Sequence, residues 1–265
     1  MDATTYLPGA DKNNSPGAPL NAYKKEYGEF IDLAAHELDA PLRKLSSFVE
    51  MLTTKFKTIS SDAEIQQYVN RIDSCVNDMR LLVKDLTSLS RIVSDKREHS
   101  SFGLETIVQE VLMDMQPMMS ESSAMLTMSE LPVIEGDKQQ YLRLFRNIIE
   151  NAIKFKRKDI TPAIHISTSR INDTEKVVYN IQDNENYIKI VISDNGIGFK
   201  QEHAEKILLP FVRLHGKHQY GGNGLGLAIC RKIVENHDGF LYAESTGNSG
   251  SSFVLIVPQT IGRSC

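Results

Sequence analysis

Two stretches in the N-terminal third of the chain repeat apolar residues at alternating steps of four and three, the seam pattern of helices that pack lengthwise. A polar turn, Ser60-Ser61-Asp62, separates them, and Ser61 or Asp62 can cap the second helix. The pattern therefore predicts a helical hairpin. Its seams are Ile31, Ala35, Leu38, Leu42, Leu45, Val49, Leu52, Phe56 and Ile59, then Ile65, Tyr68, Ile72, Cys75, Met79, Leu82, Leu86, Leu89 and Val93.

Each helix of this hairpin would be on the order of 50 Å long at 1.5 Å per residue. Two such helices cannot bury their apolar stripes with only each other and a distant globular domain as partners. We therefore expect two copies of the chain to form a homodimeric four-helix bundle. The alternative is that both helices belong to the core of a larger monomeric domain.

After Ser101 the pattern changes to a mixture of helices and strands, which predicts an α+β sandwich. The residues between 199 and 223 lack regular periodicity and are expected to form a mobile lid. The expected helices cover 104–118, 137–156 and 225–237, and the expected strands cover 124–128, 163–171, 175–181, 188–193, 240–245 and 252–257. The fold class is thus a helical hairpin followed by an α/β domain.

Composition narrows the possible functions. The chain has 265 residues, of which 41% are hydrophobic, and a net charge of −4, so nothing in its bulk charge favours nucleic acid or a membrane surface. Its three cysteines lie far apart, which indicates neither a disulfide framework nor a zinc site and fits a cytoplasmic protein. No apolar run approaches the ~18 residues of a membrane span.

Two glycine-rich segments carry the strongest chemical pattern. Ser193–Phe199 follows a β-branched run, so Asp194 is expected where a strand opens into a loop. Gly221–Leu227 leads into an apolar helix whose N-terminus favours anions. One carboxylate and two glycine turns can hold a purine by one edge and its phosphates by backbone N–H groups. The pair points to ATP, although it matches neither the Rossmann nor the P-loop spacing.

A polar face lies on the helix expected over 137–156. Asn147, Asn151 and Lys154 share that face by their i, i+4, i+7 spacing. Amide oxygens and an ammonium group suit a magnesium-bound triphosphate, because Mg²⁺ keeps most of its waters and needs few protein oxygens. An ordinary solvated polar face explains the same pattern equally well.

His36 and Glu37 lie off the seam of the first helix, and Pro41 follows within the same helix. A proline there costs about 3 kcal/mol and bends the helix axis. An imidazole with a carboxylate beside it is suited to attack a phosphoryl group. Taken alone, His36 would be an ordinary exposed histidine.

Five segments, in this order, resemble the boxes of sensor histidine kinases, and the resemblance extends from Tyr23 to Pro258. They are His36–Arg43 (H box), Arg146–Phe155 (N box), Asp194–Gly198 (G1 box), Pro210–Arg213 (F box) and Gly222–Leu227 (G2 box). The start of the first segment is similar to kinases linked to phytochrome or PAS sensors. The resemblance implies a dimerisation and histidine-phosphotransfer hairpin, followed by an ATP-binding domain of the Bergerat type.

The resemblance also implies a role for each matching residue. His36 would be the phosphoacceptor, Glu37 the base, Asn151 the magnesium ligand with Asn147 beside it, Lys154 a phosphate contact, and Asp194 the acceptor for the adenine amino group. Further ATP-binding positions are Gly196, Gly198, Phe211, Arg213, Gly222, Gly224, Leu225 and Gly226. The implied domains are a disordered lead (1–20), the hairpin (21–95), a linker (96–101), the ATP-binding domain (102–260) and a tail (261–265).

The implied function is that of an ATP-dependent autokinase that phosphorylates His36 and passes the phosphoryl group to an aspartate on the receiver domain of a response regulator, under the control of an upstream sensor. Two departures stand out: Asn223 replaces a more usual threonine, and Ala40 stands where members that also dephosphorylate their partner carry Thr or Asn. Ala40 therefore predicts weak phosphatase activity. The segment Gly250–Phe253 only approximates the last glycine box. The alternatives are a catalytically silent dimeric scaffold and an ATP-driven conformational clamp of the same superfamily.

Overall fold

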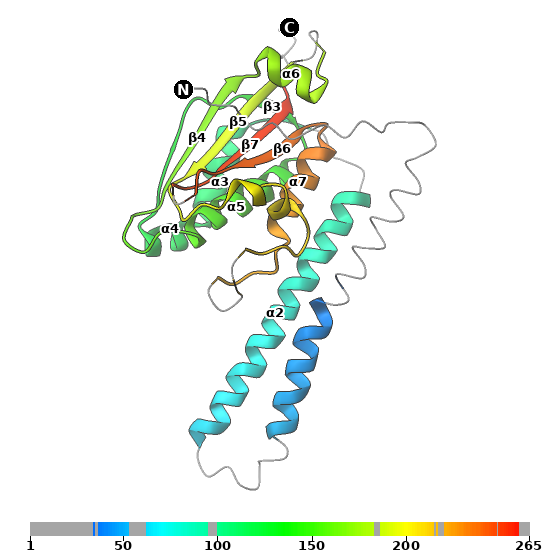
Figure 1. Ribbon diagram of the computed structural model, residues 1–265, viewed down its shortest axis with the longest axis vertical. Coiled ribbons are helices and arrows are strands. Elements are labelled where there is room, and N and C mark those ends of the chain that lie inside the picture. The colour runs from blue at the N-terminus through cyan, green and yellow to red at the C-terminus, as the bar shows by residue number, and fades with distance from the viewer. Residues whose placement is uncertain are drawn as a thin grey trace.

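A helical hairpin leads into an α/β domain in the computed structural model of the chain (Figure 1). The structure describes residues 34, 37–52, 62–94, 100–182, 186–214, 216, 220–247 and 249–259. The expected lead, the turn at Ser60-Ser61 and the C-terminal tail lie outside these residues.

The hairpin consists of a first helix, described over 37–52, and the helix α2 (Asp62–Ser94) beside it (Figure 1). The Arg71 guanidinium of α2 lies 5.7 Å from the centre of the Phe48 ring of the first helix, so the two helices touch. Cys75 and Leu82, both on the expected seam, are buried. The prediction of a hairpin is confirmed.

The second half of α2 packs against the α/β domain. Leu82, Leu89 and Ile92 belong to the same buried cluster as the core of that domain. Asn236, at the end of the helix α7 (Gly226–Asn236), donates a hydrogen bond to the carbonyl oxygen of Ile92. The expectation of a globular domain distant from the hairpin is therefore wrong. Ile92, one position before the expected Val93, is buried because this end of α2 packs against α7.

A five-stranded sheet forms the centre of the α/β domain, in the order β2-β4-β5-β7-β6. Only the pair β2–β4 is parallel, and the other neighbours are antiparallel. The strands are β2 (Met125–Met128), β4 (Ala163–Arg170), β5 (Tyr187–Asp194), β6 (Phe240–Glu244) and β7 (Ser252–Pro258). These ranges agree with the strands that alternation predicts.

Three helices cover one face of this sheet: α3 (Leu104–Asp114), α5 (Lys138–Lys154) and α7 (Figure 1). The core between them and the sheet is almost entirely aliphatic, with Tyr141 and Phe145 as its largest side chains. Ion pairs join α3 to α5 at the surface, at 2.8 Å between Lys138 and Glu110 and at 2.7 Å between Arg146 and Asp114. The helix α5 thereby lies between α3 and α7 with its polar face directed away from the sheet.

The sequence pattern did not predict several short elements. The strands β1 (Ser100–Gly103) and β3 (Val133–Gly136) pair in a small second sheet, and β1 begins within the last two residues of the expected linker. The helix expected over 104–118 ends at Asp114, and a second helix, α4 (Gln116–Ser122), follows Met115. Two 3₁₀ turns, η1 (Gln201–His203) and η2 (Lys206–Leu208), lie in the segment expected to be a lid. Four-residue strands and single turns are too short to show a period.

The strand expected over 175–181 is wrong, because most of these residues form the helix α6 (Asp173–Tyr179). Asn172 and Glu175 form a capping box: the Asn172 side chain accepts from the Glu175 N–H at 2.8 Å, and Glu175 accepts from the Asn172 N–H at 2.9 Å. Two adjacent valines in this stretch suggested a strand, but the cap overrides their weak preference.

Candidate functional site

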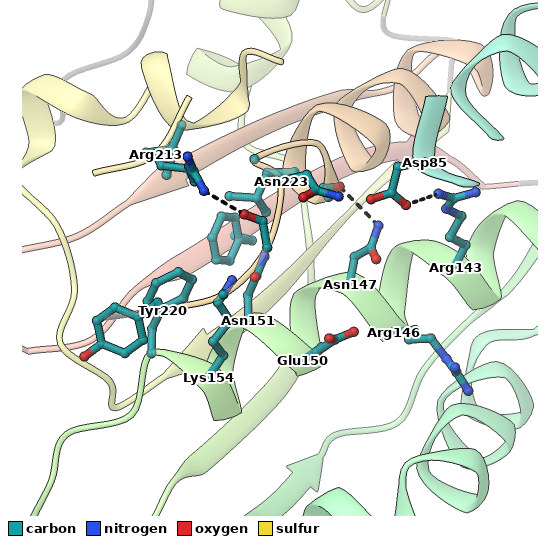
Figure 2. A pocket seen from close by; sticks show the side chains of 18 of the residues that line it. Asp85, Arg143, Arg146, Asn147, Glu150, Asn151, Lys154, Arg213, Tyr220 and Asn223 are labelled. Carbon is teal, nitrogen blue, oxygen red and sulfur yellow. Dashed lines mark hydrogen bonds and ion pairs between the residues drawn. The ribbon is translucent and has the colours of Figure 1, made fainter. Parts of the chain in front are cut away.

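A cavity of about 720 Å³ lies among α5, the end of β5, the start of α7 and one side of α2 (Figure 2). It brings together most of the residues that the sequence analysis predicts to bind nucleotide. These are Asn147, Asn151 and Lys154 from α5, Asp194 and Gly198 after β5, and Arg213, Gly222, Gly224 and Gly226 before or at the start of α7.

Asp194 is held firmly at one side of this cavity. Its carboxylate oxygen Oδ1 accepts hydrogen bonds from the N–H groups of Gly196 at 2.8 Å and Ser251 at 3.3 Å. Burial raises the pKa of this carboxyl group above its ordinary value of 3.8, while these hydrogen bonds act in the opposite direction. Because both backbone bonds reach Oδ1, acceptor capacity remains on Oδ2 for an amino group of a ligand.

Glycine is required on both sides of Asp194. A Cβ atom on Gly196 would lie 2.6 Å from the carbonyl oxygen of Phe155, which already accepts a hydrogen bond from the Ile197 N–H at 2.9 Å. Gly250 has a φ of +95°, and a Cβ atom there would overlap the carbonyl oxygen of Asp194. The turn after β5 therefore rests directly on the end of α5. Gly250, in the segment that only loosely resembles a glycine box, holds this turn from the other side.

The polar face of α5 has two parts. The Nδ2 group of Asn147 donates to the carbonyl oxygen of Gly226 at 3.1 Å, so this side chain ties α5 to the first turn of α7. Asn151 and Lys154 lie farther along the same face and point into the cavity (Figure 2). Burial lowers the pKa of Lys154, Glu150 raises it, and Arg213 lowers it further.

The second glycine segment forms a turn whose shape depends on left-handed backbone. Gly222 and Gly224 have φ values of +110° and +70°. The carbonyl oxygen of Gly224 accepts from the Phe211 N–H, and that of Gly222 accepts from Nη1 of Arg213, both at 2.9 Å. Phe211 and the fully buried Leu225 support the turn from behind and do not line the cavity.

Several residues that line the cavity were not nominated from the sequence. Leu81, Lys84 and Asp85 reach it from α2. Arg143 of α5 forms an ion pair with Asp85 at 3.1 Å. The spacing of residues in the sequence could not predict this pair, because Asp85 and Arg143 are 58 positions apart. Arg143, by contrast, could have been found, because it precedes Asn147 by four residues on the same helix face.

Of the two proposed catalytic residues, only Glu37 belongs to the part of the chain that the structure describes. His36 lies outside the described residues. Glu37 is half-buried in the first helix and is not among the residues that line the cavity.

Within the described part of the chain, no group of three or more His, Cys, Asp or Glu side chains could hold a metal ion. No helix in the same part is long and apolar enough to cross a membrane.

Comparison with known families finds two matches, one for each part of the chain. Residues 26–95 match the family described as His Kinase A (phospho-acceptor) domain. Residues 136–261 match the family described as histidine kinase-, DNA gyrase B-, and HSP90-like ATPase. The first match contains the hairpin, and the second contains α5, β5, α7 and most of the residues that line the cavity.

Individual relatives agree with these two matches. Cyanobacterial phytochrome A of Nostoc sp. is 29% identical over 90% of this chain and 29% of its own length. The phytochrome-like protein Cph1 of Synechocystis sp. is 29% identical over 87% of this chain and also 29% of its own length. The chain thus spans less than a third of these relatives. A solved structure of the histidine kinase ThkA in complex with the response regulator protein TrrA shares the fold. Its TM-score is 0.67 and its identity 19%, over 91% of this chain and 64% of that one.

Gly250→Ala tests whether Asp194 depends on its neighbouring turn. The added methyl group must displace the Asp194 backbone, and the residue must keep a strained positive φ, so we expect a loss of at least about 1 kcal/mol of stability. Gly221→Ala is the matched control, because a Cβ atom at Gly221 has no neighbour within 4 Å. Thermal denaturation followed by circular dichroism measures both variants, and equal melting temperatures would contradict the role given to Gly250.

Proposed function

We infer that the chain belongs to the sensor histidine kinases and is an ATP-dependent autokinase that phosphorylates His36 and passes the phosphoryl group to an aspartate of a response regulator. The observation that carries this proposal is the cavity, with the half-buried acceptor Asp194 on one side and a set of amides and cations along α5 and the second glycine turn. Such a cavity suits a molecule with a hydrogen-bond donor at one end and negative charge at the other.

Adenine and triphosphate would occupy opposite ends of this cavity. The exocyclic amino group of adenine would donate to Asp194, and Lys154 and Arg213 would contact the phosphates. In the transfer step, a ring nitrogen of His36 attacks the terminal phosphorus. The bond from that phosphorus to the bridging oxygen breaks, and ADP leaves. Glu37 would orient the ring and take up its proton.

Magnesium fits the donor set at the phosphate end. Because Asn147 uses its Nδ2 group on Gly226, its Oδ1 oxygen remains available next to Asn151. Amide oxygens of this kind are ligands that Mg²⁺ accepts alongside water and phosphate. Asn151, with Asn147 beside it, would hold the ion, which supplies charge neutralisation for the phosphates when it is bound.

The partner of this kinase would be a receiver domain, and its input a sensor upstream of the hairpin. The similar fold of ThkA was solved in complex with a response regulator protein, which supports a partner of this kind. The relatives are more than three times as long as the aligned part, which leaves room in such proteins for a sensor. A silent scaffold is disfavoured because the residues for ATP chemistry are present. An ATP-driven conformational clamp is also disfavoured, because such a protein has no use for a His36-Glu37 pair on the first helix of the hairpin.

His36→Gln tests the autokinase proposal. With γ-labelled ATP, the unmodified chain should acquire a label that is lost in acid and kept in base, as phosphohistidine is, and the variant should acquire none. Nucleotide affinity should stay the same, because the side chain lies off the apolar seam. His99→Gln is the control and should still be labelled. Labelling of the His36 variant would move the phosphoacceptor elsewhere, and absence of label on the unmodified chain would refute autokinase activity.

Asp194→Asn tests the position of adenine. Loss of a charged acceptor costs about 1.5–3 kcal/mol, so affinity for ATP should fall roughly ten- to a hundredfold. The unmodified chain should also lose affinity as the pH falls, since a protonated Asp194 cannot accept in the same way. Because burial raises the pKa of this carboxyl group, that loss should begin at a higher pH than for an ordinary aspartate. Isothermal calorimetry measures both effects, and unchanged affinity of the variant would rule out this contact.

A homodimer would cover apolar residues that one chain leaves exposed. Leu42 and Val49, both on the first seam, are 47% and 46% exposed, and the phospho-acceptor family match agrees with a dimerisation hairpin. Sedimentation should therefore give a dimer of the 29.8 kDa chain. Leu45→Asp should give monomers because it places a charge on the seam, whereas Lys44→Asp, off the seam, should not. A monomeric unmodified chain would contradict the bundle.

Ala40 should make the reverse reaction slow. Hydrolysis of an aspartyl phosphate needs a water molecule held in line, and a methyl group cannot hold it. The purified phosphorylated regulator, mixed with this protein without ADP, should lose phosphate slowly, and Ala40→Thr should accelerate the loss. Ala40→Ser serves as a smaller hydroxyl for comparison. Rapid dephosphorylation by the unmodified chain would show that Ala40 does not limit this activity.

A further inference from the structure

One carboxylate of the hairpin reaches into the nucleotide cavity. Asp85 of α2 lies 3.1 Å from the Arg143 guanidinium of α5, and their side chains are only 31% and 25% exposed. Burial raises the pKa of this carboxyl group, and the neighbouring Arg143 and Asn223 side chains lower it. Figure 2 shows Asp85 directed at Arg143, with Asn223 beside the pair. Asp85 thus joins the hairpin to the polar face of α5, next to the second glycine turn.

Asn223 stands at a sensitive position of that turn. It lies between Gly222 and Gly224, whose carbonyl oxygens accept from Arg213 and from the Phe211 N–H. A displacement of Asn223 would therefore shift the backbone of the turn that borders the phosphate end of the cavity. The side chain of Asn223 lies beside the hairpin carboxylate (Figure 2).

Asp85 also lies within a packed interface rather than on a free helix surface. Leu82 and Leu89, three residues before and four residues after it on α2, are buried in the core that continues into α7. The Asn236 side chain closes the far end of this interface by its hydrogen bond to the backbone of Ile92. The carboxylate is therefore held in place by apolar packing on both sides.

The cations around the cavity already have negative neighbours. Arg143 pairs with Asp85, Arg146 pairs with Asp114 at 2.7 Å, and Glu150 raises the pKa of Lys154. Arg143, Asn147, Asn151 and Lys154 follow one another on a single face of α5. A polyphosphate bound along this face would compete with the carboxylates for these cations. Arg143 lies at the end of the face that adjoins the hairpin, farthest from Phe155 and the turn that carries Asp194.

We propose that Arg143 is an additional contact for the terminal phosphate of the nucleotide, and that Asp85 is a positioning residue that holds Arg143 until that phosphate displaces it. This inference rests on the proposed function, because it takes ATP as the ligand. It links nucleotide binding to release of the hairpin, because an Arg143 guanidinium that turns to the terminal phosphate no longer holds Asp85 of α2.

Thermodynamic linkage determines whether removal of the Asp85 carboxylate strengthens or weakens nucleotide binding. If the terminal phosphate displaces Asp85, then removal of the carboxylate must strengthen binding of the triphosphate, since the two compete for one cation. A diphosphate lacks the phosphate that the proposal assigns to Arg143, so its affinity should change less. If Asp85 merely stabilised the shape of the site, its removal would instead weaken both nucleotides or neither.

The test compares a non-hydrolysable ATP analogue with ADP by calorimetry on the full chain, with Mg²⁺ present. Asp85→Asn should bind the analogue up to about fivefold more tightly, the range expected for a partly exposed ion pair. Asp73→Asn, an exposed aspartate on the same helix, is the matched control and should change neither affinity. Arg143→Gln should weaken the analogue relative to ADP, and adding Asp85→Asn to that variant should give no further gain.

Each outcome of this experiment supports or overturns a specific claim. A ratio of analogue to ADP affinity that is unchanged or lowered in Asp85→Asn overturns the inference. Should that variant fail to fold, an unchanged ratio in Arg143→Gln overturns it equally. If the unmodified chain binds neither nucleotide, the proposed function itself is wrong. If it binds both and the variants follow the Asp73 control, only the role of Asp85 and Arg143 is wrong.

Discussion

The contact between the turn after β5 and the last turn of α5 is the constraint on which the site depends. Gly196 leaves no room for a side chain against the carbonyl oxygen of Phe155, and Ile197 donates to that same oxygen. The contact fixes the distance between the Asp194 carboxylate and the polar face of α5. An acceptor for a base and a platform for phosphates are thereby held in one geometry by a contact between two backbone segments. Such a preformed arrangement reduces the ordering that a ligand would otherwise impose on binding.

A second constraint comes from the hairpin. The helix α2 contributes Leu82, Leu89 and Ile92 to the same core as α7, and it places Asp85 beside Arg143. One helix surface thus supports the fold and borders the nucleotide cavity. The proposed competition between a terminal phosphate and Asp85 would couple the hairpin to the cavity, and such a coupling acts equally in both directions.

The sequence allowed the long elements and the glycine turns to be predicted, since both are encoded locally. The seam that contains Cys75 and Leu82 predicts burial, and the spacing of Asn147, Asn151 and Lys154 predicts one shared face, as the structure has it. Failures have equally local causes. The adjacent valines of α6 suggested a strand, although the capping box of Asn172 and Glu175 makes a helix. The pairing of Asp85 with Arg143 and the support of Asp194 by Gly250 depend on contacts between distant segments, for which a single sequence carries no pattern.

The central claim is that one cavity, with Asp194 on one side and the polar face of α5 on the other, binds ATP in a single orientation. A crystal structure of the chain with a non-hydrolysable ATP analogue and Mg²⁺ tests it most directly. We expect the adenine amino group within hydrogen-bond distance of the Asp194 carboxylate, and the phosphates between Asn151, Lys154 and the turn that contains Gly222 and Gly224. Phosphates next to Asp194, or an analogue bound outside this cavity, would contradict it.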